Sequence, residues 1–172
     1  MSWVAYTDGG CKPNPGRGGF GVVLLRGGIL ARELSGGEAS TSNNRMELTA
    51  AVEALRAVPD GEALTIHVDS IYVKDGITKW LRAWRKNGWR TKDGEPVKNR
   101  ELWEALAAEV DRRTVEWRWV KAHDGDRWNE RADELATAAR RGGPSIARDP
   151  LPGVVEVACA AAEASGAASA GA

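Results

Sequence analysis

Residues 3–10 read WVAYTDGG, and residues 64–70 read LTIHVDS. Each stretch has the apolar, partly alternating character of a β-strand, and each ends in an aspartate, Asp8 or Asp69, where a turn or helix follows. Residues 43–58, between them, form a helix-like stretch long enough for the right-handed crossover of a βαβ unit. Neighbouring parallel strands lie ~4.8 Å apart, so both aspartates are expected at the carboxyl edge of one sheet, where α/β folds commonly bind ligands.

The rest of the chain supplies further strands and helices around this unit. Alternation and glycine turns predict strands at 20–25, 29–34 and 115–120, the first two completing an antiparallel meander with the amino-terminal strand. Helical spacing of apolar residues predicts helices at 43–58, 71–81 and 99–113, and a last one whose apolar stripe runs from Trp128 to Ala139. The predicted order, βββαβααβα, is that of an α/β protein.

Short polar residues mark where two of these helices should begin. Asn43 and Asn44 are predicted to cap the first helix, and Ser70 the second, because such side chains accept hydrogen bonds from unpaired amides of a first turn.

Length and composition set the broad class. A chain of 172 residues fits one domain with one core. Lys and Arg number 24, as do Asp and Glu, so any nucleic-acid signal must be local. Cys11 and Cys159 lie far apart and form no zinc or disulfide pattern. With no signal-peptide pattern and no apolar run of ~20 residues, the expectation is a soluble, cytoplasmic protein with no membrane contact, and monomer is the default.

Residues 142–172 differ in composition from the rest. They are rich in Ala, Gly, Ser and Pro, which predicts a largely disordered tail after a catalytic domain at 1–141. The alternative is that the apolar stretch Val154–Ala158 docks on the domain as an extra strand or segment.

Two more carboxylates accompany Asp8 and Asp69. Glu47 heads the stripe of the first predicted helix that should meet the sheet, and Asp133 borders the stripe of the last. Singly, each of the four has an ordinary role at a turn or helix. Together they would repel by roughly 4 kcal/mol per pair at 4 Å with an effective dielectric near 20, so the cluster needs cations. Oxygen-only ligands favour Mg2+, and two such ions can promote phosphodiester displacement.

A local basic segment lies at residues 79–98. Between Lys79 and Lys92 there are six basic residues, three tryptophans and no acidic residue. Cations of this kind bind phosphate backbones, and tryptophan faces pack on sugars or bases. The alternative is a solvated basic helix face with Trp80 and Trp84 packed inside.

Five separated motifs together resemble a known family. In chain order, they are Tyr6–Cys11 with Asn14–Gly16, Asn43–Leu48, Val68–Ser70, Trp119–His123 and Asn129–Ala136. Their order and spacing resemble the type 1 ribonucleases H, the bacterial ribonuclease HI family, over about residues 3–141. The resemblance implies a ribonuclease H-like α/β fold with a five-stranded mixed sheet flanked by helices. It also implies hydrolysis of the RNA strand of RNA/DNA hybrids, leaving 5′-phosphate and 3′-hydroxyl ends.

The resemblance also implies roles for individual residues. The four metal-binding catalytic carboxylates would be Asp8, Glu47, Asp69 and Asp133, holding one or two ions of magnesium, or of manganese. His123 would be the loop histidine that assists proton transfer or product departure, whereas mid-strand His67 is predicted to be structural. Contacts to the hybrid would come from Cys11, Asn14, Asn43 and Asn44. The basic segment would grip the DNA strand through Lys79, Trp80, Arg82, Trp84, Arg85, Lys86 and Trp89.

The chain departs from the family pattern at two places. Ile71 stands where the family generally has a glutamine that contacts RNA, which puts one substrate hydrogen bond in question. Asp124 and Asp126 make the loop of His123 more acidic than in many relatives. Two other functions remain open at this stage: an inactive hybrid-binding module, and a different metal-dependent phosphotransfer enzyme such as a phosphatase or a junction-resolving nuclease.

Overall fold

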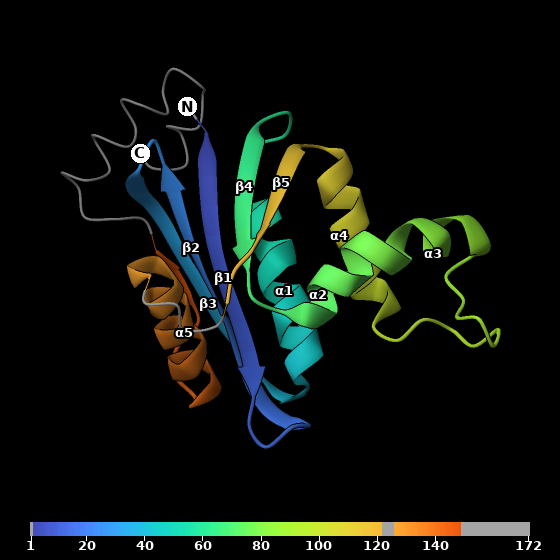
Figure 1. The fold of residues 1–172 in the computed structure, drawn as a ribbon. Coiled ribbons are helices and arrows are strands. Elements are labelled where there is room, and N and C mark those ends of the chain that lie inside the picture. Colours follow the sequence, from blue (N-terminus) through green and yellow to red (C-terminus); the bar gives the residue numbers. More distant parts are fainter. Residues whose placement is uncertain (1, 122–125, 149–172) are drawn as a thin grey trace.

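The computed structural model describes residues 2–121 and 126–148 as one sheet with helices on both faces (Figure 1). The strand order is β5-β4-β1-β2-β3-β6. The strands are β1 (Trp3–Cys11), β2 (Gly16–Arg26), β3 (Ile29–Thr41), β4 (Ala63–Val68), β5 (Thr114–Trp119) and β6 (Ile146–Arg148). The helices are α1 (Asn43–Arg56), α2 (Ile71–Asp75), the π-helical turn η1 (Gly76–Trp80), α3 (Leu81–Asn87), α4 (Arg100–Asp111) and α5 (Arg127–Arg140).

The strand pairing confirms the predicted topology. β1, β2 and β3 form an antiparallel meander, whereas β1 pairs with β4, and β4 with β5, in parallel. Helix α1 connects β3 to β4 and crosses over β1 and β2. In the register, Tyr6 of β1 lies beside His67 of β4. Asp8 and Asp69 each follow two residues later, so they reach the carboxyl edge of the sheet at the same level.

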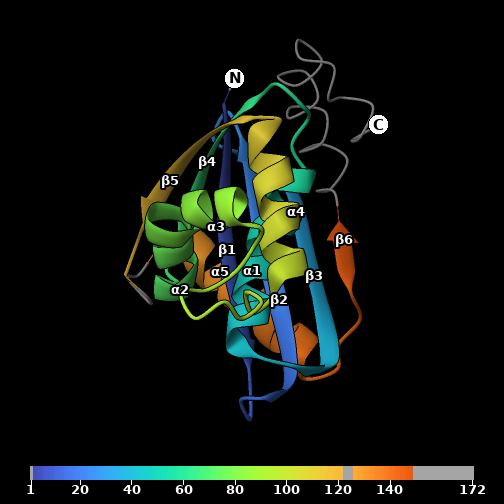
Figure 2. The ribbon, with the colours of Figure 1, turned by 90° about the vertical axis from the view of Figure 1, so that its right-hand side faces the viewer.

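The helices divide unequally between the two faces. Helix α5 alone packs on β1, β2 and β3 from one side, whereas α1 packs on β1 and β2 from the other and α4 lies outside α1 (Figures 1 and 2). Most buried apolar residues lie on the α1 side, and a smaller group around Val23 and Leu135 lies under α5. Within the described part of the chain, none of the helices has the length and apolar character needed to cross a bilayer.

The two predicted helix caps have different outcomes. Ser70 caps α2 as predicted, since its hydroxyl accepts a hydrogen bond from the amide of Val73. The prediction for α1 is wrong: its cap is Ser42, which has extended backbone and accepts from the amide of Arg45. Asn43 is the first helical residue, and its side chain does not cap α1 because it accepts a hydrogen bond from the Cys11 amide.

The second helical region is longer than the predicted 71–81. After α2 the chain makes the π-helical turn η1 and continues as α3 to Asn87, where Gly88 ends the helix with a φ of 78°. A β-carbon on Gly76, within the π-turn, would lie 2.7 Å from Cζ3 of Trp103. Because Gly76 has no side chain, the buried Trp103 ring can pack directly against its backbone.

The sheet also has a sixth strand. Residues 146–148 pair antiparallel with Glu33–Ser35 of β3, so β6 covers part of an otherwise open edge. This strand lies inside the segment predicted as a disordered tail. The rest of that segment, residues 149–172 with Val154–Ala158, lies outside the described residues.

Two glycines set the distance of the helices from the sheet beside Asp8. A β-carbon on Gly9 would lie 2.5 Å from the Met46 carbonyl oxygen in the first turn of α1. One on Gly21, the partner of Asp8 on β2, would overlap the Ala132 carbonyl oxygen of α5. Both helices therefore approach the sheet at the level of Asp8.

Replacing Gly21 with alanine should push α5 away from the sheet. We expect Gly21→Ala to lower the free energy of unfolding by about 1–3 kcal/mol, as overpacking in cores does, measured by urea denaturation. Gly10→Ala is the matched control, because the nearest atom to its β-carbon would be 4.0 Å away. Equal stability of both variants would contradict the close approach.

Candidate active site

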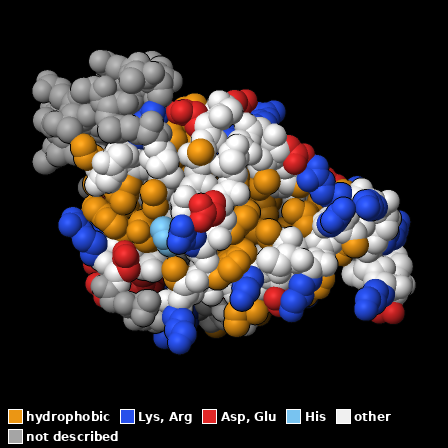
Figure 3. All heavy atoms as spheres, turned by 45° about the horizontal axis from the view of Figure 1, so that its top comes forward, with side chains coloured by type: hydrophobic (Ala, Val, Ile, Leu, Met, Phe, Trp, Pro, Cys, Tyr) orange, Lys and Arg blue, Asp and Glu red, His pale blue; other side chains and the backbone are white. Residues whose placement is uncertain are grey.

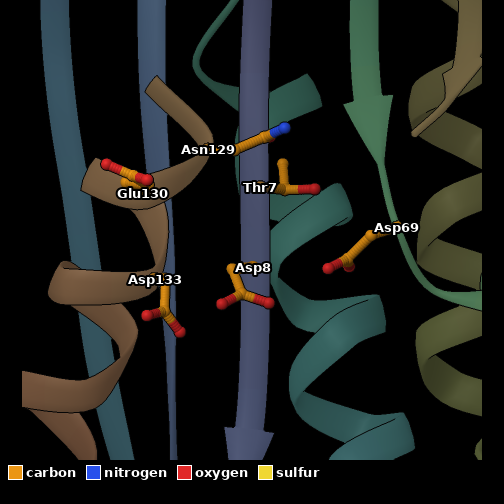
Figure 4. Close-up of a pocket in the computed structure, with 6 residues that line it drawn as sticks. All are labelled: Thr7, Asp8, Asp69, Asn129, Glu130 and Asp133. Carbon is orange, nitrogen blue, oxygen red and sulfur yellow. The ribbon is translucent and has the colours of Figure 1, made fainter. Parts of the chain in front are cut away.

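Three of the predicted carboxylates line one pocket at the carboxyl edge of the sheet. Asp8 comes from β1, Asp69 follows the end of β4, and Asp133 lies on α5. Figure 4 shows Asp8 between the other two, with the Asp133 side chain on the α5 side and Asp69 on the β4 side. Thr7, Asn129 and Glu130 complete the lining. The parallel pairing of β1 with β4 and the close approach of α5 bring these three groups together.

Asp8 is the electrostatic centre of the pocket. Its pKa is raised from 3.8 to about 8, first by burial, then by a hydrogen bond with Asp133 and by the negative charges of Asp69 and Asp133, while the Gly9 amide partly opposes the shift. Two carboxyl groups share a hydrogen bond only when one carries a proton. With no cation bound, the Asp8–Asp133 pair therefore keeps a proton near neutral pH.

Glu47 lies beside Asp69. Its Oε2 accepts a 2.5 Å hydrogen bond from the Ser70 hydroxyl, which also caps α2. Burial raises the pKa of Glu47, the Ser70 hydrogen bond lowers it, and the charge of Asp69 raises it. Ser70 thus links the start of α2 to the carboxylate on α1. Sequence reasoning identified Ser70 only as a cap, although its position directly after Asp69 was a signal of this second role.

The four carboxylates fit a hard divalent cation by their chemistry. In residues 2–121 and 126–148, no group of three or more His, Cys, Asp or Glu side chains is placed to hold a metal ion. Asp8 interacts with both Asp133 and Asp69, and Asp69 also interacts with Glu47. Every donor is an oxygen, as Mg²⁺ prefers, and a cation would take over the role of the proton shared by Asp8 and Asp133.

Grooves continue from the pocket in two directions, each with cations in its walls. One groove runs from Asp8 and Asp133 past Lys12, Asn43 and Arg140. The other leads from Asp69 past two further lysines and the exposed Ile71, and is lined by Val68, Asp69, Ser70, Ile71, Lys74, Trp119, Val120 and Lys121. An acidic pocket between two grooves that carry basic side chains suits a polyanion that lies along both grooves and over cations bound in the pocket.

The predicted substrate-contact residues of the first loop form a small hydrogen-bonded network. Asn43 Oδ1 accepts a 2.6 Å bond from the Cys11 amide, and Asn14 Oδ1 accepts a 3.1 Å bond from the Asn43 amide. The Cys11 thiol is buried and donates to the Pro13 carbonyl at 3.0 Å, so its sulfur is used within the loop. Asn44 is exposed at the start of α1.

The RNase H family model matches residues 1–141 of the chain. The chain belongs to the RNase H family. It is 55% identical over 131 residues to the ribonuclease H of Hahella chejuensis, covering 76% of this chain and 88% of that protein. Enzymes of this family depend on divalent metal ions.

Solved structures agree with this assignment. LC9-RNase H1, a type 1 RNase H with the type 2 active-site motif, is 32% identical, with a TM-score of 0.75 over 98% of this chain and 83% of that chain. LC11-RNase H1 in complex with RNA/DNA hybrid is 25% identical, with a TM-score of 0.63 over 81% of this chain and 97% of that chain.

The basic segment of this RNase H projects from the body (Figure 1), and Figure 3 shows its Lys and Arg side chains gathered on the projecting arm. Its cations are not equivalent. Lys79 pairs with Asp75 at 3.3 Å, and Arg85 holds both carboxylate oxygens of Asp111. Two of the other predicted contacts, Arg82 and Lys86, are exposed with no ion-pair partner among the described residues.

The tryptophans of the arm also differ from one another. Trp80 is 37% exposed, whereas Trp84 packs edge-on against the buried Trp103 with ring centroids 5.4 Å apart. Trp89 is half-buried beside Trp84. The alternative of an inward-packed Trp pair therefore holds for Trp84 and not for Trp80.

Of the two histidines, the structure describes only His67. His67 stacks on Tyr6, with ring centroids 4.3 Å apart and planes 4° apart, and burial lowers its pKa. His123 and Asp124 lie outside the described residues. Asp126, which follows them, caps α5 by accepting from the amides of Trp128 and Asn129. The acidic character of this loop therefore has a structural use at its carboxyl end.

The raised pKa of Asp8 predicts how stability depends on pH in the absence of divalent ions. The pKa of Asp8 in the folded protein, about 8, exceeds the ordinary carboxyl value of 3.8, which applies to the unfolded chain. Ionising Asp8 therefore destabilises the fold, and the free energy of unfolding falls as pH rises from about 4 through 8. We expect Asp8→Asn to remove this loss and to be more stable at pH 9 by on the order of 2 kcal/mol.

Urea denaturation in EDTA at pH 5, 7 and 9 measures this difference. Asp93→Asn, on the exposed loop after α3, is the control and should follow the wild type. Adding Mg²⁺ should narrow the gap by stabilising the ionised wild type. Identical pH dependence of wild type and Asp8→Asn would show that the carboxylates do not repel in the folded state.

Proposed function

We propose that this chain is an endoribonuclease that hydrolyses the RNA strand of RNA/DNA hybrids and leaves 5′-phosphate and 3′-hydroxyl ends. The observation that carries the proposal is the position of Asp8, hydrogen-bonded with Asp133 and close enough to Asp69 for their charges to interact. The RNase H match over residues 1–141 supports the reaction. The hybrid bound by LC11-RNase H1 supports the substrate.

Asp8, Glu47, Asp69 and Asp133 would hold one or two magnesium ions, or manganese ions in their place. When bound, such a metal supplies an activated water and neutralises charge on the scissile phosphate. The chain itself contributes position. The four carboxylates come from β1, α1, the residue after β4 and α5, and the Ser70 hydroxyl donates a hydrogen bond to Glu47. His123, by its place in the motif order, would receive or deliver a proton near neutral pH.

The choice of RNA would come from the hydrogen-bonded loop beside the carboxylates. A protein distinguishes RNA from DNA chiefly through the 2′-hydroxyl, which both donates and accepts hydrogen bonds. Asn14, Asn43 and Asn44 carry amides that can do both, and Asn43 lines the same groove as Asp8 and Asp133. The arm at 79–98 would hold the other strand through its exposed cations.

A cleavage assay tests the proposed reaction. Labelled RNA/DNA hybrid, double-stranded DNA, single-stranded RNA and a phosphomonoester are incubated with the wild type, Asp8→Asn and Asp93→Asn. We expect cleavage of the hybrid alone, lost in EDTA, restored by Mg²⁺, and lowered at least ~100-fold in Asp8→Asn, since removing a group that stabilises transition-state charge typically costs 10²–10³.

Each outcome discriminates between functions. Binding of hybrid without cleavage by the wild type would favour the inactive binding module. Cleavage of the phosphomonoester would favour a phosphatase. Undiminished cleavage by Asp8→Asn would contradict the role of Asp8.

The exposed cations of the arm predict a salt-dependent contribution to substrate binding. We expect the double variant Arg82→Gln/Lys86→Gln to raise KM several-fold and to flatten its dependence on salt, because fewer phosphate contacts release fewer counterions. The control is Arg112→Gln, which removes an exposed cation at the end of α4. An unchanged salt slope in the double variant would show that the exposed cations of the arm do not contact the substrate.

A further inference from the structure

The groove on the α5 side of the carboxylates has cations that no proposed role yet uses. Its floor includes Gly9 and Gly10 of β1, and it extends from Asp8 to Lys12 in the β1–β2 turn. Arg140, at the end of α5, lies in the opposite wall. One groove therefore connects the acidic centre at one end with two basic side chains from different elements at the other.

Helix geometry sets how far these cations lie from the acidic centre. Asp133, Thr137 and Arg140 all line this groove from α5, as residues at i, i+4 and i+7 on one helix face do. Seven residues of α-helix rise about 10.5 Å. Arg140 therefore lies on the same helix face as Asp133, about 10.5 Å further along α5.

The Arg17 side chain ties the β1–β2 turn to the end of α5. The Lys12 amide donates to the Arg17 carbonyl at 3.0 Å, and Arg17 Nε donates to the Arg140 carbonyl at 2.9 Å. Arg17 therefore satisfies a carbonyl at the end of α5, so the Arg140 side chain is not needed there. Nothing in residues 2–121 and 126–148 forms an ion pair with Lys12 or Arg140.

We propose that Lys12 and Arg140 form a phosphate-binding site for the nucleic-acid backbone, at the end of the groove away from the carboxylates. The site lies on the α5 side of the sheet, whereas the basic arm projects from the α1 side (Figure 1). It rests on the proposed function and extends it, because the bound duplex would be held by cations on both sides of the carboxylates. Phosphate contacts of this kind set register and orientation without reading sequence.

The test uses the full chain with Lys12→Gln and Arg140→Gln combined. We expect KM for an 18-base-pair hybrid to rise about 5–10-fold with kcat unchanged, and the slope of log KM against log salt to fall by about 1–2, as loss of one or two phosphate contacts predicts. Arg56→Gln/Arg112→Gln is the matched control, because it removes two exposed cations from the far ends of α1 and α4.

A second measurement locates the contact. Hybrids with one cleavable position are shortened from each end in turn, until one base pair remains beyond the scissile bond. Shortening one end should abolish the difference in KM between wild type and the double variant, and shortening the other should preserve it. A difference that survives both truncations would place the contact elsewhere and overturn the proposal.

The remaining outcomes distinguish a failure of the phosphate site from a failure of the proposed function. A wild type that cleaves no hybrid would refute the proposed function itself. A wild type that cleaves, with a double variant of unchanged KM and salt slope, would refute the phosphate site alone. A lower Tm in the double variant with an unchanged salt slope would assign both cations to the stability of α5 and also overturn the proposal.

Discussion

The structure depends on placing a half-buried carboxylate, Asp8, between two helices that approach the same strand from opposite faces. Asp8 sits on β1 where Gly9 admits the first turn of α1 and Gly21, its neighbour on β2, admits α5. Without these bare backbones, α1 and α5 would stand further from the sheet, and Glu47 and Asp133 with them. The geometry of the pocket therefore depends first on how closely these two glycines let the helices approach, and only then on the acidic residues.

That arrangement concentrates negative charge, and among residues 2–121 and 126–148 no Lys or Arg side chain offsets the raised pKa of Asp8. Burial and neighbouring charges raise the pKa of Asp8 to about 8, so the site takes up either a proton or a metal. Lys12 and Arg140 on one side, and Lys74 and Lys121 on the other, line the grooves rather than the pocket. These basic side chains therefore flank the acidic pocket on both sides.

Much of the fold could be predicted because its signals are local. Apolar alternation and glycine turns gave the five long strands, and the helix between two strands made their parallel pairing nearly unavoidable. The cap of α1 was harder, because Ser42 and Asn43 have similar intrinsic preferences. The choice was decided by a long-range bond, since the Asn43 side chain accepts from Cys11 on β1. Strand β6 was missed because its three residues carry no pattern and pair only through an available edge.

The sequence by itself determined the family, the order of the main elements along the chain and the meander of the first three strands, because motif order and periodicity are written along the chain. Only the tertiary structure decided how individual residues are used. It gave Ser70 a second bond to Glu47 and paired Arg85 with Asp111, while leaving Arg82 exposed. It also brought Lys12 and Arg140 into one groove. These are contacts between residues far apart in sequence, so their distances follow from packing and not from spacing.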